Sequence, residues 1–87
     1  MAGDVQKQLG ELEQLATTLE VRVCYEAMTG LSQGGGGLCK VRGEWRVIMD
    51  RRLKPADRLH VLAESLRGFD TEAHFVSPQV RALLGDA

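Results

Sequence analysis

The stretch Trp45–Phe69, WRVIMDRRLKPADRLHVLAESLRGF, decides the fold. The segment 45–50 is mostly apolar, which is typical of a buried strand. A charged turn follows, and Pro55 stands where a helix can begin without losing a needed N–H donor. The leucines beyond it recur at steps of three and four, which predicts an amphipathic helix over 55–67. The stretch therefore predicts a strand that leads directly into a helix.

The rest of the chain supplies four more elements. Periodicity and turn residues predict a helix over 4–19, strands over 21–28 and 38–41, and a final helix over 78–84. The glycine-rich segment 29–37 is expected to be a plain connection between strands, and Phe75 is expected to pack into the core. This order predicts an α+β fold: a small three-stranded, mainly antiparallel sheet with a hairpin, on which the N-terminal helix and two C-terminal helices pack.

Length and composition limit the classes of function. The chain has 87 residues, which we interpret as a single domain over 1–87. Its apolar share of 44% and charged share of 26% are those of a folded globule. A formal net charge of -1 gives no overall attraction to nucleic acid or membrane. No apolar run approaches the roughly 20 residues that span a bilayer, and the first residues lack a signal-peptide layout, so the expected compartment is the cytoplasm.

The register of the hairpin follows from burying its apolar side chains. A three-residue loop, Arg42–Glu44, would place Val41 opposite Trp45. A two-residue loop would instead place Val41 beside charged partners, so we expect the longer loop. One face of the sheet would then carry Cys39, Val41, Trp45, Val47 and Met49. Ile48 would lie on the other face with Arg46 and Asp50, partly exposed.

The strand, turn and helix of the central stretch resemble the core of the ImmA/IrrE-like zinc peptidases, which include phage-type antirepressor proteases. In that family the helix carries LAHELGH, whose two histidines bind zinc and whose glutamate activates water. The matching run here is LAESLRG over 62–68, with Glu64 and Gly68 at the ligand positions and Ser65 at the general-base position. Other matching scaffold residues are Asp50, Pro55, Arg58, Leu62 and Ala63. The resemblance implies a retained scaffold without catalytic residues, metal or cofactor.

A rebuilt metal site is the alternative to a lost one. His60 and Glu64 lie four residues apart and share a helix face. A zinc site needs at least three protein ligands, and His74 or Glu72 is the nearest source of a third. The simpler interpretation of His60 is a surface histidine beside a carboxylate.

Cys24 and Cys39 are the only cysteines. In a reducing compartment they are two small buried apolar residues. Because both lie on predicted strands, a disulfide between them is an alternative. A metal site that joins them to His60 and His74 is another, although none of these residues has the usual ligand spacing.

Basic residues concentrate in one part of the chain, and they leave two interpretations open. The residues are Arg42, Arg46, Arg51, Arg52, Lys54 and Arg58. They could contact nucleic-acid phosphates, but the single tryptophan and single tyrosine offer little base stacking. Alternatively they form a solvated rim that complements the acidic N-terminal helix.

Together these observations favour a non-catalytic protein-interaction or regulatory module. The residues expected to contact a protein partner are Arg46, Ile48, Arg51 and Arg52, because Ile48 among charges resembles an interface anchor. A nucleic-acid-associated regulator that uses the same arginines is the first alternative, and a metal-dependent hydrolase is the second. The leucine stripe of the N-terminal helix could cover the sheet or form the seam of a homodimer, and we expect it to pack within the chain.

Overall fold

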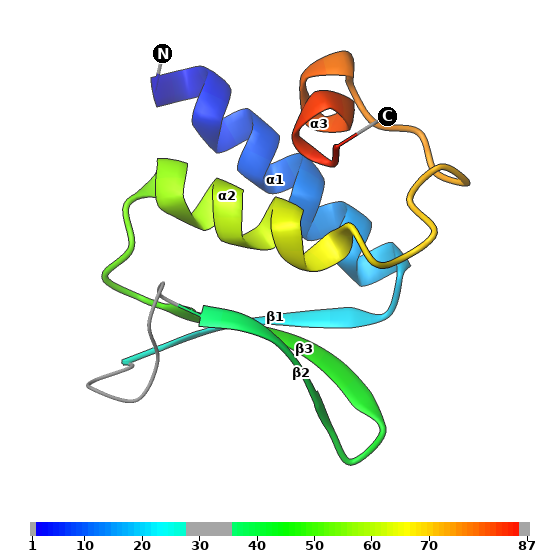
Figure 1. The fold of residues 1–87 in the computed structure, drawn as a ribbon. Helices are drawn as coiled ribbons and strands as arrows, with labels where there is room; N and C mark the ends of the chain where they lie inside the picture. The colour runs from blue at the N-terminus through cyan, green and yellow to red at the C-terminus, as the bar shows by residue number, and fades with distance from the viewer. Residues whose placement is uncertain (1, 28–35, 86–87) are drawn as a thin grey trace.

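The computed structural model describes residues 2–27 and 36–85 and shows an α+β fold, as the sequence predicts (Figure 1). Its elements are α1 (Ala2–Thr18), β1 (Val21–Glu26), β2 (Gly36–Val41), β3 (Glu44–Asp50), α2 (Pro55–Leu66) and α3 (Pro78–Leu83). β1 ends two residues before the predicted end of its strand, and β2 begins two residues before the predicted start. The prediction of a connecting loop over 29–37 falls largely on residues 28–35, which lie outside the described residues.

The sheet is mixed, with strand order β1-β3-β2. β2 pairs with β3 in antiparallel fashion, as predicted for the hairpin, but β1 pairs with β3 in parallel. The expectation of a mainly antiparallel sheet therefore holds for one of the two pairings. β3 is the central strand of the sheet, and its Val-Ile-Met run makes it the most apolar of the three strands. A central strand is covered by neighbours along both edges, which suits such a run.

The hairpin has a two-residue turn, which corrects the predicted register. Arg42 and Gly43 both have positive φ, 53° and 80°, the conformation of the two-residue turns that match the twist of paired strands. Val41 consequently pairs with Glu44, and Trp45 pairs with Lys40. Turn geometry therefore outweighs the apolar pattern at the tip of the hairpin, where Val41 stays exposed.

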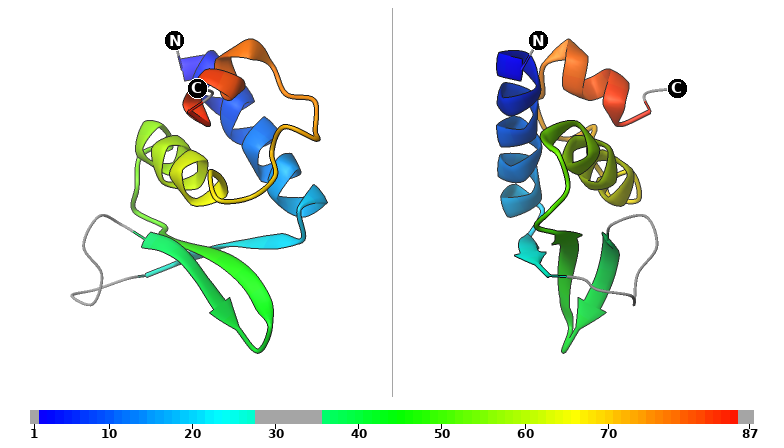
Figure 2. Two further views of the ribbon diagram at one scale, coloured as in Figure 1. Left: turned by 45° about the vertical axis from the view of Figure 1, so that its right-hand side comes forward. Right: turned by 90° about the vertical axis from the view of Figure 1, so that its left-hand side faces the viewer.

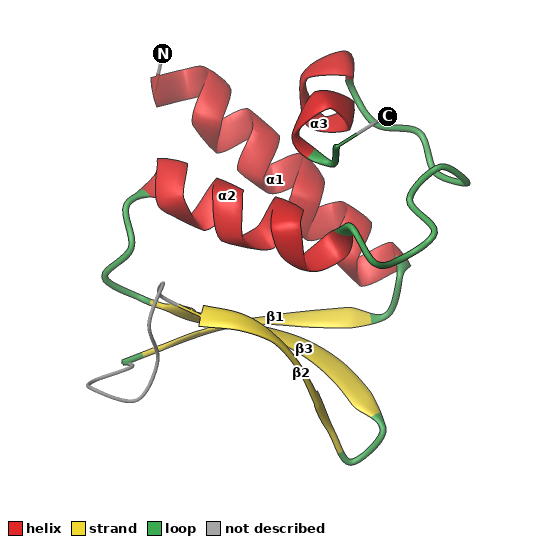
Figure 3. Ribbon diagram, viewed as in Figure 1, coloured by secondary structure: helices red, strands yellow, loops and turns green. Residues whose placement is uncertain are grey.

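All three helices lie on one side of the sheet (Figures 1 and 3). We call the side that faces them the inner face and the other side the outer face. Val47 and Met49 of β3 point to the inner face and are fully buried. The corrected register moves Cys39 and Val41 from the predicted inner set to the outer face, because they pair with Arg46 and Glu44. The views in Figure 2 show the hairpin extending away from the helices.

The core fills the space between the helices and the inner face. Its buried apolar residues are Leu9, Leu12, Leu15, Ala16, Val21, Val47, Met49, Leu59, Leu62, Ala63, Leu66, Val80 and Leu84. The leucine stripe of α1 belongs to this set, so it packs within the chain as expected. In the described ranges, 2–27 and 36–85, no helix combines the length and apolar character needed to cross a membrane.

Phe75 does not pack into the core, contrary to the prediction. Its side chain is 96% exposed. Phe69, at the other end of the connector between α2 and α3, packs against the core and meets Trp45 edge to face at 5.6 Å between ring centroids. Val76 also packs against the core. The connector is therefore held on both sides of Phe75 without burying that ring.

Candidate functional site

The outer face is the candidate site, because it places an apolar centre within a rim of charges. Its side chains are Arg22, Cys24 and Glu26 of β1, Cys39 and Val41 of β2, and Glu44, Arg46 and Ile48 of β3. Cys24 and Ile48 pair with each other across β1 and β3 and are half-buried. Within the described part of the chain all helices lie on the inner side of the sheet, so none of them covers this surface (Figure 3).

Ile48 occupies the middle of this surface for simple local reasons. It lies between Val47 and Met49, so strand alternation points it away from the core that holds those two side chains. Its neighbour on β2 is Gly37, which has no side chain. A Cβ atom at Gly37 would meet no heavy atom within 4 Å, so the space beside Ile48 on this strand is open. The arrangement leaves Ile48 partly exposed at the centre of the face.

Arg46 lies at the rim, where it forms an ion pair with Glu44 of the same strand. Its Nη2 lies 2.9 Å from Glu44 Oε1, and its Nε donates to the same oxygen at 3.0 Å. Both side chains are substantially exposed. Exposed pairs of this kind contribute about 0–1 kcal/mol, so a partner's carboxylate could replace Glu44 at little cost.

Arg51 and Arg52 lie in the turn after β3 rather than on the outer face. Arg52 holds Asp50 through Nε at 3.2 Å and Nη2 at 3.0 Å, while its backbone N–H donates to the same carboxylate at 2.9 Å. These hydrogen bonds lower the pKa of Asp50 and raise that of Arg52. The backbone of Arg51 donates to Glu26 O at 2.9 Å. The predicted contact set therefore divides. Arg46 and Ile48 share a face, the Arg52 side chain stabilises the turn, and Arg51 is an exposed residue of that turn.

The basic patch is partly engaged inside the molecule. The guanidinium group of Arg58 lies 4.8 Å from the ring centroid of Tyr25 and donates to the carbonyl oxygen of Arg51 at 2.8 Å. Arg46 and Arg52 have carboxylate partners, as described above. Three of the six basic side chains in the patch thus have intramolecular roles, which reduces the charge available for phosphates.

Glu13 and Tyr25 form a link between α1 and β1 that sequence reasoning missed. The Tyr25 hydroxyl donates to Glu13 Oε2. Burial, this hydrogen bond and the negative charge of Glu13 raise the pKa of Tyr25 to about 12. The two residues are twelve positions apart and belong to different elements, so no local pattern could have identified the pair.

The candidate metal ligands do not converge. His60 Nε2 and Glu64 Oε2 lie 3.8 Å apart on α2, with their side chains 73% and 65% exposed. His74 lies on the connector, where its carbonyl oxygen accepts from Arg81 at 2.9 Å. Over residues 2–27 and 36–85, no three His, Cys, Asp or Glu side chains form a group that could hold a metal ion.

The two cysteines lie on the strands that flank β3, one along each edge, and this separation rules out the disulfide considered above. Cys24 pairs with Ile48 on one edge of β3, and Cys39 pairs with Arg46 on the other. Two strand spacings alone separate their Cα atoms by about 9.5 Å, and an offset of two residues along β3 adds to that distance. A disulfide needs Cα atoms within about 7 Å, and both thiols are free.

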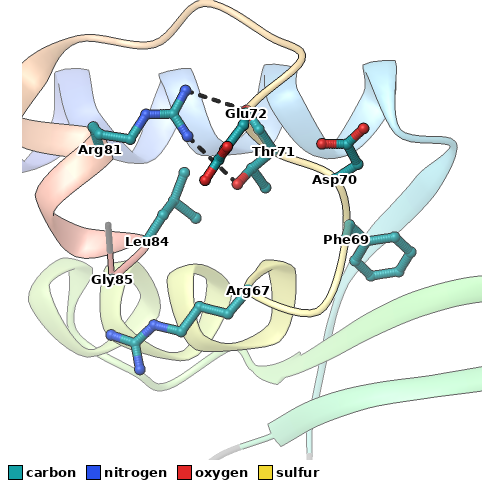
Figure 4. A pocket seen from close by; sticks show the side chains of 8 residues that line it. All are labelled: Arg67, Phe69, Asp70, Thr71, Glu72, Arg81, Leu84 and Gly85. Carbon is teal, nitrogen blue, oxygen red and sulfur yellow. Dashed lines mark hydrogen bonds between the residues drawn. The ribbon is translucent and has the colours of Figure 1, made fainter. Parts of the chain in front are cut away.

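A separate polar pocket lies between α2, the connector and α3, with a volume of about 220 Å³ (Figure 4). Its two arginines donate hydrogen bonds to the connector and to α3. Arg81 Nη2 donates to the carbonyl oxygens of Thr71 and His74 at 3.2 and 2.9 Å, and Arg67 Nη2 donates to Leu83 O at 3.0 Å. These contacts explain the pocket as a brace for the C-terminal helix.

Comparison of the chain with family models, curated proteins and solved structures finds no match.

Proposed function

We propose that this protein is a non-catalytic protein-binding module that docks a partner on its outer face, with Ile48 at the centre of the contact. The observation that carries the proposal is the half-buried pair of Cys24 and Ile48, which no described helix covers. An apolar centre within a polar rim is the usual composition of a protein–protein interface. Arg46 supplies a cation at the rim that can orient the partner.

The proposal includes a degenerate peptidase scaffold of the ImmA/IrrE-like type. It is supported by the direct passage from β3 through a charged turn to Pro55 and α2. Glu64, Ser65 and Gly68 stand where the resemblance would require the zinc ligands and general base. On this proposal the scaffold keeps its shape and acts by binding, as a regulatory protein in the cytoplasm. A reducing compartment suits the two free thiols.

The two alternatives have less support. A nucleic-acid-associated regulator would use the basic patch, but Arg46, Arg52 and Arg58 are engaged by other groups of the protein. A metal-dependent hydrolase would need a third ligand near His60 and Glu64, and the described residues bring none to that part of α2.

Photo-crosslinking tests the proposed surface directly. Benzoylphenylalanine would replace exposed Val41 on the outer face or, as a matched control, exposed Gln79 on α3. We expect a specific protein adduct from position 41 in the cells that express the protein, and none of the same mass from position 79. Ile48→Glu in the position-41 protein should remove the adduct while the circular dichroism spectrum is unchanged.

Two results would contradict the proposal. The first is a set of adducts that is the same at positions 41 and 79. The second is an adduct at position 41 that persists in the folded Ile48→Glu protein. Should Ile48→Glu fail to fold, Cys24→Arg places a charge on the same apolar pair from the neighbouring strand.

A further inference from the structure

The open edge of β1 borders a groove that overlaps the outer face only at Arg22 and Glu44. Among the described strands β1 pairs with β3 alone, so the main-chain groups along its other edge have no strand partner there. A groove of about 480 Å³ lies beside β1 and is lined by Val21, Val23 and Tyr25 of the strand and by Glu13 and Thr17 of α1. Figure 2 shows α1 above β1 at this side of the sheet.

The dimensions of this edge suit an extended peptide. β1 has six residues, which span about 20 Å in an extended chain. An unpaired strand edge offers alternating N–H and C=O groups that a peptide can pair with as an added strand. Val23 and Tyr25 are half-buried on the inner face beside the groove, so they can contact every second side chain of such a peptide.

The charge of the groove selects the kind of peptide. Three carboxylates line it, those of Glu13, Glu20 and Glu44, together with the cation of Arg22. Because Arg46 forms an ion pair with Glu44, the excess of negative charge comes from Glu13 and Glu20. Glu20 and Arg22 are exposed. A surface with this excess of negative charge favours lysine and arginine in its ligand and disfavours acidic residues.

We propose that this groove binds an extended basic peptide segment that adds to β1 as a fourth strand. The groove shares Arg22 and Glu44 with the rim of the outer face, but it does not include Cys24 or Ile48, on which the proposed function depends. The two can therefore fail separately.

Fluorescence anisotropy with three labelled peptides tests the proposal. The probes are KVTVKVTVK, its acidic counterpart EVTVEVTVE, and KVTPKPTVK, in which prolines remove main-chain donors. We expect saturable binding of the first peptide, at least about tenfold tighter than either other peptide in 50 mM salt. Equal binding of the proline peptide would overturn strand addition, and equal binding of the acidic peptide would overturn the role of the carboxylates.

Two neighbouring threonines of α1 provide matched variants. Thr17 lines this groove, whereas Thr18 lines a different groove on α1. Both are exposed, and each hydroxyl donates to the carbonyl four residues earlier, at 3.2 and 3.1 Å. Thr17→Trp should fill the groove and weaken binding of KVTVKVTVK at least about tenfold, while Thr18→Trp should leave it unchanged. Equal effects of the two substitutions would overturn the placement.

Charge substitution and an outer-face variant complete the design. Glu20→Lys should weaken binding of the basic peptide more than Glu72→Lys, which changes an exposed carboxylate outside the groove. Ile48→Glu should leave the peptide affinity unchanged, because Ile48 lies on the opposite face. Loss of binding in Ile48→Glu with retention in Glu20→Lys would overturn the proposal and assign the peptide to the outer face.

Discussion

The two faces of the sheet use similar apolar residues for different ends. On the inner face of β3, Val47 and Met49 are fully buried beneath the helices. On the outer face, Ile48 lies between them in sequence but is only half-buried. Burial contributes about 25 cal/mol per Å² of apolar surface, so each inner residue is expected to stabilise the fold more than Ile48 does. The comparison separates the apolar residues of β3 that build the core from Ile48, which keeps an exposed surface.

The largest expected effect separates the two faces by stability. Met49→Ala should lower the free energy of unfolding by about 3 kcal/mol, because it removes buried methylene groups and leaves a cavity. Ile48→Ala should lower it by about 1–2 kcal/mol, because part of that side chain already meets water. Urea denaturation followed by circular dichroism measures both. Equal losses would show that the outer face is part of the core.

A smaller effect tests the turn that decides which residues reach each face. Gly43 has φ of 80°, where a Cβ atom is strained, so Gly43→Ala should destabilise the protein by about 1 kcal/mol. Arg42→Asn should stabilise it by about 0.5 kcal/mol, because asparagine tolerates the positive φ of that position. Thermal unfolding measures both changes. A neutral Gly43→Ala would indicate the three-residue loop instead.

Acid should weaken the turn beyond the outer face. The pKa of Asp50 is lowered from 3.8 by hydrogen bonds from the Arg52 side chain and backbone. A carboxyl with a lowered pKa stabilises the fold above its unfolded pKa, and that stability is lost as the pH falls through the folded pKa. The stability difference between wild type and Asp50→Asn should therefore be constant above about pH 5 and shrink below pH 4. Asp57→Asn is the control, and an unchanged Asp50→Asn difference at low pH would contradict the pairing.

The smallest effect concerns the link that holds α1 over β1. Tyr25 is the only tyrosine, so absorbance at 295 nm follows its ionisation directly. Its titration midpoint should lie near pH 12, because burial and Glu13 raise its pKa to about 12. The stability from this raised pKa is complete below pH 10 and is lost as the pH rises towards 12. Glu13→Ala should move the midpoint towards 10, and a wild-type midpoint near 10 would contradict the link.

Local patterns were sufficient to predict the elements of this fold. The apolar run of β3 and the proline that opens α2 each act within a few residues. The start of α3 is also local, because the Ser77 hydroxyl accepts a hydrogen bond from Val80 N–H at 3.3 Å. The α+β class and the position of Ile48 with Arg46 followed from the same local rules. Features that depend on which distant segments contact each other were harder to predict from the sequence.

Three features illustrate that limit. The parallel pairing of β1 with β3 depends on which strand takes the centre of the sheet, and alternation alone does not decide that. The two-residue turn needed Arg42 at positive φ, which is uncommon for a residue other than glycine or asparagine. Phe75 was expected in the core because it is large and apolar. Phe69 and Val76 pack against the core instead and hold the connector there.

The site was predictable only in part for the same reason. Strand alternation predicted that Ile48 and Arg46 share one face of the sheet. Arg51 and Arg52 were grouped with them by charge, whereas their hydrogen bonds assign them to the turn. The contribution of Cys24 and Cys39 to the outer face depends on the strand order and on the register of the hairpin, so it emerged from the structure.

Thiol alkylation inside cells tests the central claim most directly, because Cys24 and Cys39 both lie on the outer face. The rate of N-ethylmaleimide labelling at each thiol would be measured by mass spectrometry for the protein in its own cells and for the purified protein. A partner docked on this face should slow labelling of both thiols in cells by about fivefold or more. In cells, the Ile48→Glu protein should be labelled as fast as the purified protein. Equal labelling rates for the wild-type protein in cells and in purified form would contradict the account.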